Sequence, residues 1–528
     1  MNVLLAAMLM LQSTIATGSI NGTVVRAGTS LQIPLESARV ELSGGPGLPI
    51  VVRTDLHGRF AFASLLPGSY RLRVTKDGYL RQEYAKRASL VIKSEVPHKS
   101  VVVELEVAPT MGGRVRNEFG EPIGNIMVTA LKAGYATNGK KIFQALATTL
   151  TDERGEYRLY WLDPGEYILR AAIMPPIPTP GNPNNLVPRA VYAPTYYPVA
   201  SDLANAQRIP LRADQDVLAL DFQLKHAPAV YVRGTVSSRS SSRASDRPPV
   251  NTLVTLALAG DSAGATPYSG KTDERGDFEI SNVAPGDYTA SADISIGGQR
   301  YSAVKHIVVR DKDENNVGLM MSPGIEVPGR IALESGGPLD WSAIQIRLKS
   351  EDPFLELFSA AGVPSDGKFS VLNVQPGSYS LDVSGIPQDF YVKTERSDSL
   401  NLATSPLGIL WDAPALLQII IGIDAGRMSG SVVDASSNAF AGAQVVLVPN
   451  LERRDRPDQY RVTTSDEEGR FEIRGIPPGA YQLFAWETVE ESAWRSSEFM
   501  TNYWTAASQF VVPANAAGTV QVPLIPGQ

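Results

Sequence analysis

The stretch that most resembles a catalytic element is the pentapeptide GDSAG, which places Ser262 at its centre. It matches the pattern G-x-S-x-G, in which a serine on a sharp turn between a strand and a helix serves as a nucleophile. A strand-like run, LVTLALA, precedes it, but the following residues, ATPYSG, do not predict the helix that would expose the serine hydroxyl. We therefore interpret the stretch as a loop, and a hydrolase that uses Ser262 stays the alternative.

Metal chemistry would need histidines and carboxylates at short spacing, but the four histidines are scattered: His57, His98, His226 and His306. None lies in the H-E-x-x-H pattern, with which a zinc peptidase places two ligands on one helix face. The aspartate-containing turns lack the dense D-x-D-x-D spacing of a calcium loop. The sequence thus predicts no catalytic residue, no metal site and no cofactor.

Aromatic side chains are the remaining feature that could mark a ligand surface. Two related inserts, PRAVYAPTYYPVASDLANAQRIPL and SSEFMTNYWTAASQFVV, contain adjacent aromatic residues. Exposed aromatic rings offer a large apolar area at low entropic cost, so they stack on sugar rings or bury a peptide. We predict ligand contacts at Tyr196, Tyr197, Tyr503 and Trp504, with packing at a sheet edge or between domains as the alternative.

Bulk composition excludes several function classes. A net charge of −7 over 528 residues gives no electrostatic case for nucleic acid or an anionic membrane as a partner. The absence of cysteine excludes disulfides, thiolate metal sites, a cysteine nucleophile and a lipid-modified cysteine anchor. At about 100 to 150 residues per domain, the chain should divide into four or five units.

The amino-terminal residues predict export. The stretch MNVLLAAMLMLQSTIA combines a short apolar core with small residues at a cleavage position. We interpret residues 1–16 as a signal peptide, although no Lys or Arg precedes the apolar run, and a first buried strand is the alternative. The longest later apolar run, Leu416 to Ile423, has the length of a strand, so no transmembrane segment is predicted in the mature chain. The protein is expected in the periplasm, on the outer surface or in the medium.

One motif occurs five times and sets the domain organisation. It reads TDERGEYRLYWLDPGEY from residue 151, and every copy places an aromatic residue two positions after a glycine, a proline seven after that aromatic, and a tyrosine three after the proline. The glycines recur at intervals of 97, 121, 91 and 102 residues: Gly58, Gly155, Gly276, Gly367 and Gly469. These intervals are typical of domains rather than of solenoid repeats.

Each copy of the motif predicts a β-hairpin. An aspartate before the glycine can accept backbone N–H bonds, and the glycine supplies the positive φ of a tight turn. Residues after the glycine alternate between apolar and polar, Pro-Gly predicts a type II turn, and a second alternating strand follows. The aspartates are Asp55, Asp152, Asp273 and Asp466, with Asp366 in a shortened fourth copy.

A G-x-[VI] strand and another alternating strand precede every hairpin. No copy contains a convincing helix, and because a hairpin alone is only marginally stable, each unit must pack its apolar strand faces against a second sheet. We therefore predict five β-sandwiches in a row. Their expected ranges are 19–108, 109–226, 227–322, 323–424 and 425–528.

The succession G-x-V, T-D-x-x-G-x-F and L-x-P-G-x-Y resembles the carboxypeptidase regulatory-like domain, a transthyretin-like (prealbumin-like) sandwich, over nearly all of residues 19 to 526. The resemblance implies an all-β chain of five tandem transthyretin-like or Ig-like β-sandwich domains after an N-terminal signal peptide. Such domains accompany metallocarboxypeptidases, precede outer-membrane receptor barrels or occur in modules related to starch-binding domains. Long exported chains of these repeats are typical of soil bacteria. Because a fold does not define an activity, the resemblance implies no reaction.

We therefore expect an exported, non-enzymatic binding or scaffold protein. Its expected partner is a polysaccharide or a protein of the cell envelope or the extracellular space. The alternative is an accessory or catalytic component of an extracellular hydrolase or peptidase system.

Overall fold

The computed structural model describes residues 18–527 except 29–30, 45–47, 85–89, 93–97, 137, 174–189, 239–249, 259–267, 297–298, 337–338, 352–357 and 411–415. The predicted signal peptide, residues 1–16, and Ser262 lie outside the described residues. The described chain is almost entirely β, which confirms the predicted fold class. Its helical elements are α1 (Ser497–Met500) and the single 3₁₀ turns η2 (Leu203–Asn205), η3 (Leu451–Arg453), η4 (Pro457–Gln459), η5 (Ala493–Arg495) and η6 (Trp504–Ala506).

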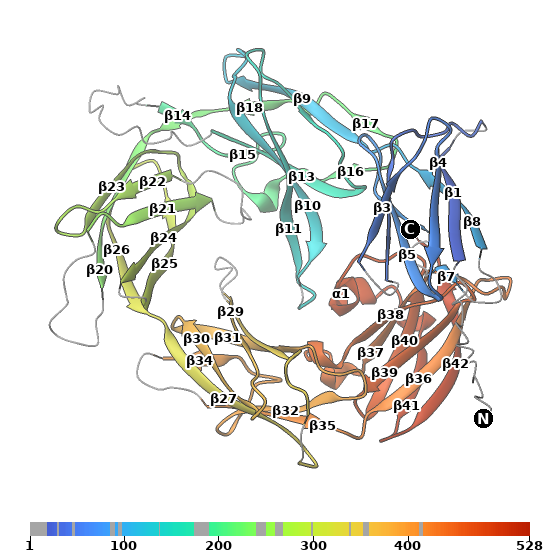
Figure 1. The fold of residues 1–528 in the computed structure, drawn as a ribbon. Helices are drawn as coiled ribbons and strands as arrows, with labels where there is room; N and C mark the ends of the chain where they lie inside the picture. The colour runs from blue at the N-terminus through green and yellow to red at the C-terminus, as the bar shows by residue number, and fades with distance from the viewer. Residues whose placement is uncertain are drawn as a thin grey trace, which may run out of the picture.

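Five clusters of buried side chains follow one another along the chain, and we call the strands around them units 1 to 5 (Figure 1). The strands alternate between buried and exposed residues, so each cluster fills the space between two sheet layers. The buried residues span 20–105, 111–224, 230–321, 327–421 and 428–522. The residue boundaries between the units stay a prediction.

Units 1 and 2 each consist of two sheets. Unit 1 has the strand orders β4-β1-β8 and β3-β2-β5-β6, with β7 on β5; unit 2 has β12-β9-β17, with β18 on β9, and β11-β10-β13-β15, with β16 on β13. The strands of unit 1 are β1 (Gly18–Arg26), β2 (Arg39–Ser43), β3 (Ile50–Arg53), β4 (Arg59–Leu65), β5 (Gly68–Thr75), β6 (Gln82–Glu83), β7 (Leu90–Ile92) and β8 (His98–Leu105). Those of unit 2 are β9 (Thr110–Asn117), β10 (Ile126–Tyr135), β11 (Lys141–Leu150), β12 (Glu156–Leu159), β13 (Gly165–Ile173), β14 (Ala190–Tyr192), β15 (Thr195–Tyr196), β16 (Ile209–Leu211), β17 (Asp216–Val217) and β18 (Phe222–Leu224). Strand β19 (His226–Pro228) pairs with β14 and leads into unit 3.

Unit 3 differs because its strands join in one sheet, β22-β21-β24-β25-β26-β20-β23, in which the long β24–β25 hairpin connects the two layers. Unit 4 returns to two sheets, β30-β27-β35-β32-β33 and β29-β28-β31-β34. The strands of unit 3 are β20 (Val230–Ser238), β21 (Leu253–Leu258), β22 (Tyr268–Lys271), β23 (Asp277–Val283), β24 (Gly286–Ile296), β25 (Gln299–Val309) and β26 (Glu314–Pro323). Those of unit 4 are β27 (Ile325–Leu333), β28 (Gln345–Ser350), β29 (Phe358–Gly362), β30 (Lys368–Val374), β31 (Gly377–Ser384), β32 (Tyr391–Ser397), β33 (Leu400–Asn401), β34 (Leu407–Ile409) and β35 (Leu417–Gly422).

Unit 5 also joins its strands in one sheet, β38-β37-β40-β42-β36-β39, with β41 on β40. Its strands are β36 (Gly426–Val433), β37 (Gln444–Pro449), β38 (Arg461–Thr464), β39 (Arg470–Ile476), β40 (Gly479–Trp486), β41 (Ser508–Val512) and β42 (Ala517–Ile525). The described helix α1 and four of the 3₁₀ turns belong to this unit. They form the segments that extend beyond its sandwich.

One cross-strand pair recurs in every unit: the glycine of the G-x-[VI] strand lies opposite the motif aromatic. A Cβ at Gly329 would lie 2.2 Å from Phe369 Cζ, so a larger residue would displace the ring. Each ring is buried in its core, with at most 5% exposed. The pairs are Gly22–Phe60, Gly113–Tyr157, Gly234–Phe278, Gly329–Phe369 and Gly430–Phe471.

The aspartate turns form as predicted. Asp273 Oδ1 accepts the N–H groups of Arg275 and Asp277 at 2.8 and 2.9 Å, and Gly276 between them has a φ of 83°. Because these bonds favour the charged carboxylate, they lower the pKa of Asp273. The same pair of bonds occurs at Asp55, Asp152 and Asp466, whereas Asp366 in the shortened fourth copy accepts the N–H of Lys368 at 3.0 Å.

The prediction of type II turns at Pro-Gly is wrong. Such a turn needs a φ near +80° at the glycine, whereas Gly165, Gly377 and Gly479 have φ of 151°, 158° and 151° and begin strands. A left-handed residue lies three positions before each proline instead, with φ between 56° and 64°: Ser64, Trp161, Asn282, Asn373 and Gly475.

The motif tyrosine closes this turn. Its hydroxyl donates to the carbonyl oxygen four residues earlier, at 2.6 to 2.9 Å, as in the tyrosine corners of other β-sandwiches. The bond ties the tyrosine to the residue directly before the motif proline and so spans the turn. The five donors and acceptors are Tyr70–Leu66, Tyr167–Asp163, Tyr288–Ala284, Tyr379–Gln375 and Tyr481–Pro477.

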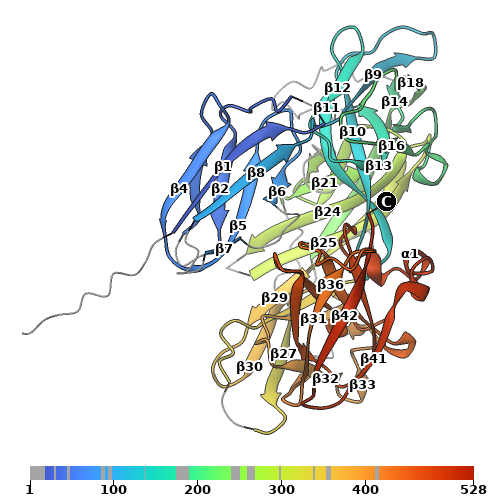
Figure 2. The same ribbon diagram turned by 90° about the vertical axis from the view of Figure 1, so that its right-hand side faces the viewer.

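The units lie around a ring in which unit 5 meets units 1 and 2 (Figure 1). Lys99 Nζ in unit 1 lies 2.8 Å from a carboxylate oxygen of Glu467 in unit 5, and this bond raises the pKa of Lys99. Tyr135 at the end of β10 packs edge-on against Phe499, with ring centroids 6.0 Å apart. Figure 2 shows unit 1 projecting to one side of unit 5, so the ring is not flat.

The glycine–aromatic pair predicts a strong effect of one methyl group. Gly329→Ala should lower the free energy of unfolding of unit 4 by about 1–3 kcal/mol because the Phe369 ring must move. Gly408→Ala in the same unit is the matched control, since a Cβ there meets no atom within 4 Å. Denaturant unfolding of both variants checks the prediction, and equal midpoints would contradict it.

The tyrosine bond predicts a smaller effect. Tyr379→Phe should lower the free energy of unfolding by about 1 kcal/mol, because the Gln375 carbonyl oxygen loses a buried donor. Tyr231→Phe, at a half-buried ring that the Arg233 guanidinium covers at 4.3 Å, serves as the control. Thermal unfolding compares the two, and an unchanged Tyr379→Phe midpoint would show that the hydroxyl does not hold the turn.

Candidate functional site

The first predicted aromatic pair lies at the edge of unit 2. Tyr196 ends β15, which pairs with β13, and its backbone bonds with Ala200 close a small turn. Tyr197 is half-buried against the core of unit 2, with its ring edge-on to Phe222 at 5.7 Å between centroids. Packing at a sheet edge therefore accounts for part of the Tyr197 ring, and ligand contact at either residue stays a prediction.

The second pair covers the outer face of the β37–β40 sheet in unit 5. There a separate cluster of apolar residues, which we call the outer cluster, forms on the side away from the sandwich core. Tyr503 lies edge-on to Trp486 at 5.6 Å, and Trp504 lies edge-on to Phe484 at 5.9 Å. The buried members of the outer cluster are Val446, Val448, Tyr460, Phe484, Trp486, Trp494 and Met500.

A guanidinium completes this aromatic surface. The Arg454 guanidinium carbon lies 3.6 Å from the centre of the Trp504 ring, and Nη2 donates to Gln482 at 3.3 Å. Burial lowers the pKa of Arg454 from its usual value. The sequence does not predict the contact between Arg454, in the segment ERRDRPDQY, and Trp504, because fifty residues separate them.

Tyr503 and Trp504 both pack on the outer cluster of unit 5, whereas the Tyr197 ring contacts Phe222 within unit 2. The connection between the two units runs through another residue, Tyr135, which packs on Phe499 beside Tyr503. Burial and the charges of Glu490 and Glu498 raise the pKa of Tyr135. The aromatic surface of unit 5 therefore lies at the junction with unit 2.

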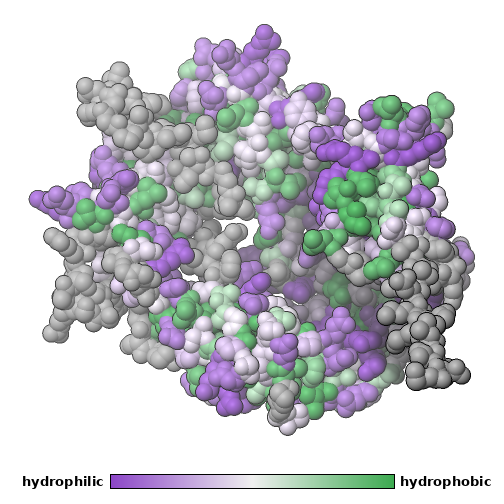
Figure 3. Space-filling model, in the orientation of Figure 1, coloured by the Kyte–Doolittle hydropathy of each residue, from purple (hydrophilic) through white to green (hydrophobic). Residues whose placement is uncertain are grey.

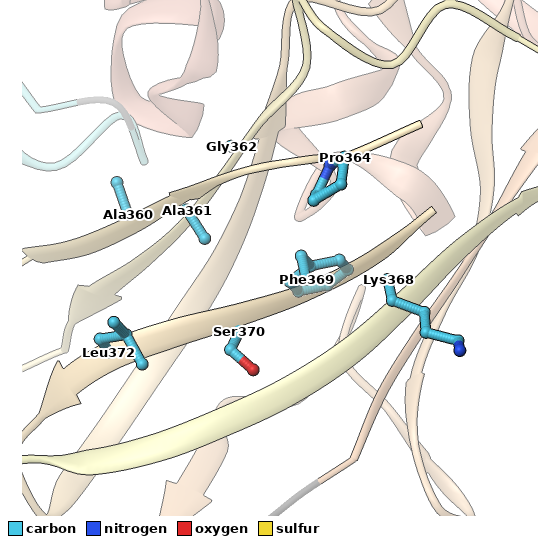
Figure 4. Close-up of a pocket in the computed structure, with 8 residues that line it drawn as sticks. All are labelled: Ala360, Ala361, Gly362, Pro364, Lys368, Phe369, Ser370 and Leu372. Atoms are coloured by element: carbon cyan, nitrogen blue, oxygen red, sulfur yellow. The ribbon is translucent and has the colours of Figure 1, made fainter. Parts of the chain in front are cut away.

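A depression of 490 Å³ lies elsewhere, on β29 and β30 of unit 4 (Figure 4). Small and apolar side chains form most of its wall, and Figure 4 shows Lys368 pointing away from the other residues. Binding pockets usually join an apolar wall to a few converging polar groups. The described residues of this depression do not provide such a set: Ala360, Ala361, Gly362, Pro364, Lys368, Phe369, Ser370 and Leu372.

The histidines lie apart in the structure too. His98 Nδ1 lies 2.9 Å from Ser19 Oγ, and His226 Nδ1 lies 2.7 Å from a carboxylate oxygen of Glu118. In the part of the chain that the structure describes, no three His, Asp or Glu side chains form a group that could hold a metal. Within the same residues, no helix is long and apolar enough to cross a membrane.

A buried carboxyl group in unit 4 interacts electrostatically with charged residues of unit 5. Glu395 on β32 is 4% exposed, and burial raises its pKa to about 8. The charges of Asp458 in unit 5 and Asp382 on β31 raise this pKa further, while Arg456 opposes them. Glu395 is therefore neutral in the folded protein near neutral pH.

The charge on Glu395 predicts a pH-dependent stability. Its folded pKa of about 8 lies above the ordinary value of 4.5, so its contribution to stability is fully present below about pH 4.5 and is lost as the pH rises towards 8. Glu395→Gln should therefore unfold at a higher denaturant concentration than the wild type at pH 8.5 and at nearly the same concentration at pH 5.

The control for this prediction is Glu326→Gln, at an exposed position on β27 of the same unit. It should change the unfolding midpoint little at either pH. A difference between wild type and Glu395→Gln that is the same at pH 5 and pH 8.5 would show that Glu395 is charged in the folded protein at both.

The fold and the repeated motif define a protein of tandem transthyretin-like β-sandwiches. Residues 19–103 and 427–524, which lie in the first and last units, match the family model of the carboxypeptidase regulatory-like domain. Colossin-A of Dictyostelium discoideum is 23% identical over 384 residues, which are 67% of this chain and 3% of Colossin-A. The chain thus spans a small fraction of the length of this curated relative.

The solved structures that are similar to this chain include three bacterial proteins. The Bacillus anthracis TIE protein is 12% identical, with 86% of this chain and 71% of that chain covered and a TM-score of 0.16. A streptococcal ancillary pilin is 13% identical, with 56% and 99% covered and a TM-score of 0.21. The B1B2 repeat units of the collagen binding protein of Staphylococcus aureus are 11% identical, with 72% and 94% covered and a TM-score of 0.14. TM-scores this low carry no argument about arrangement or activity.

Proposed function

We propose that the protein is an exported, non-enzymatic scaffold that binds an extracellular polysaccharide through aromatic side chains on its ring of β-sandwiches. The observation that carries the proposal is the aromatic surface of unit 5, which lies outside the sandwich core and contains Tyr503 and Trp504. Both rings are half-buried, so each has a packed side that fixes its orientation and a side that water reaches. Rings held in this way are suited to stack on the apolar face of a sugar.

The surroundings of Trp504 favour a polar ligand. The Arg454 guanidinium covers one face of the Trp504 ring, so a sugar would stack on the remaining exposed part of the ring while guanidinium N–H groups donate to its hydroxyl groups. Apolar and polar residues also alternate over the face of the ring in Figure 3, where the coloured apolar residues form several separate patches.

The contacts between units support the scaffold part of the proposal. Units that are distant in the sequence meet through Lys99 and Glu467 and through Tyr135 and Phe499. These contacts hold the units at fixed relative positions, so that one chain can present several surfaces to one polymer. Export is supported by the predicted signal peptide and by the motif's resemblance to domains of exported proteins.

Affinity electrophoresis in gels that contain neutral and uronic-acid polysaccharides tests the proposal. Wild-type protein should be retarded by at least one polymer, and Trp504→Ala should reduce the retardation, because the stacking face is lost. Leu451→Ser is the matched control, since Leu451 is an exposed apolar residue (75%) of the same unit.

Because Trp504 also packs on Phe484, thermal unfolding of Trp504→Ala must accompany the binding measurement. Trp504→Phe, which retains an aromatic ring, should recover part of the retardation. Absence of retardation of the wild type by every polysaccharide would reject the sugar ligand, and a protein of the envelope would then be the expected partner.

A further inference from the structure

A tryptophan occupies a backbone position that disfavours it. Trp161 has a φ of 58° and is three residues before the motif proline of unit 2, while the four equivalent positions hold residues that tolerate the left-handed region better: Ser64, Asn282, Asn373 and Gly475. In this region the Cβ of an L-residue crowds the backbone, and a bulky side chain is unusual there. Burial does not compensate, because 62% of Trp161 is exposed. A strained residue with an exposed side chain indicates a role in function rather than in stabilising the fold.

Neighbouring residues extend the exposed ring into a small surface. Tyr160, the residue before it, is 54% exposed, and the Arg158 guanidinium carbon lies 6.0 Å from the centre of the Tyr160 ring. Gly112 on β9 lies next to both Arg158 and Leu218. A Cβ at Gly112 would lie 3.0 Å from Arg158 Cγ and 3.4 Å from a methyl carbon of Leu218. Arg158, Tyr160, Trp161 and Leu218 thus lie at one end of the β12-β9-β17 sheet, and we call them the Trp161 surface.

The same turn has a different environment in later units. A Cβ at Gly475 would lie 2.6 Å from the carbonyl oxygen of Gln388, so in unit 5 this turn packs against unit 4. In unit 4 the turn packs against the residue before the first strand, because a Cβ at Gly324 would lie 2.1 Å from the Cα of Asn373. The turn of unit 2 likewise contacts the residue before its first strand, since the Leu162 N–H donates to the Pro109 carbonyl oxygen at 3.3 Å, but its left-handed residue is a tryptophan that is 62% exposed.

We propose that the Trp161 surface is a second polysaccharide-binding site, in which a sugar ring stacks on Trp161 and Tyr160 and Arg158 donates hydrogen bonds to its hydroxyl or carboxylate oxygens. The inference rests on the proposed function, in that it takes a polysaccharide as the ligand. Two aromatic side chains provide much less than the about 800 Å² that each partner buries in a stable protein interface, but they match the area of one or two sugar rings. An arginine beside the rings supplies donors in a planar arrangement.

The test uses Trp161→Asn in the full-length protein. Asparagine is the natural residue at the equivalent position of units 3 and 4, so the variant should unfold at the same temperature as the wild type or higher. In affinity electrophoresis on the polysaccharide that retards the wild type, its dissociation constant should rise about tenfold or more. Tyr160→Ser should weaken binding in the same direction. Phe119→Ser is the matched control, because Phe119 is an aromatic residue of the same unit with 76% exposed, and it should bind as the wild type does.

The outcomes separate this inference from the proposed function. Loss of binding in Trp161→Asn and Tyr160→Ser, with unfolding temperatures unchanged or raised and Phe119→Ser unaffected, supports the site. Wild-type binding that both variants retain overturns the site and leaves the proposed function standing. A wild type that no polysaccharide retards overturns both. Equal loss in Phe119→Ser would assign the effect to a general change of unit 2 and overturn the site as well.

Discussion

The contact between a glycine and an aromatic ring on the neighbouring strand is the constraint on which units 1, 3, 4 and 5 depend, while in unit 2 a Cβ at the paired Gly113 would first meet the backbone of Leu220. The ring of Phe369, for example, occupies the space that a Cβ at Gly329 would fill, which fixes the register of β27 against β30. Since a one-residue slip in a strand moves every side chain to the opposite face, one fixed pair determines which residues enter the core. The hairpin and the G-x-[VI] strand therefore fix this register together, although they are separated by about 40 residues in the sequence.

The sequence allowed the hairpin and the G-x-[VI] strand to be located, but it did not show how they contact each other. Alternation along the strands, the five copies of the motif and the aspartate turns led to an all-β chain, which the structure confirms, because these features depend on residues close in sequence. The turn at Pro-Gly was misassigned for a physical reason. The Tyr379 hydroxyl bonds to the carbonyl oxygen of Gln375 and so stabilises a left-handed residue at Asn373, and nothing in the Pro-Gly pair itself indicates that bond.

The candidate site was accessible to sequence reasoning only in part. Tyr503 and Trp504 could be named from composition, but their shared cluster with Phe484 and the stacked Arg454 follows from the tertiary fold. Trp161 could have been found by aligning the five motif copies, because it stands where the others have serine, asparagine or glycine. The alignment marks Trp161 as unusual, and the φ of 58° shows that the backbone position disfavours a tryptophan. Glu395 gives no signal in the sequence, since the charges around it come partly from another unit.

Closure of the ring has a consequence for how molecules of this protein could associate. Lys99 and Glu467 meet within one chain, where the intervening units keep the two partners at a high effective concentration. A modest contact therefore suffices to hold units 1 and 5 together. The same two surfaces are complementary between different chains. Opening of the ring would also separate Tyr135 from Phe499, which join units 2 and 5. A molecule opened in this way would carry one half of the ion pair at each end, and joining such ends head to tail would give a linear polymer. The balance between the closed molecule and such a polymer would depend on protein concentration and on salt, which screens the ion pair.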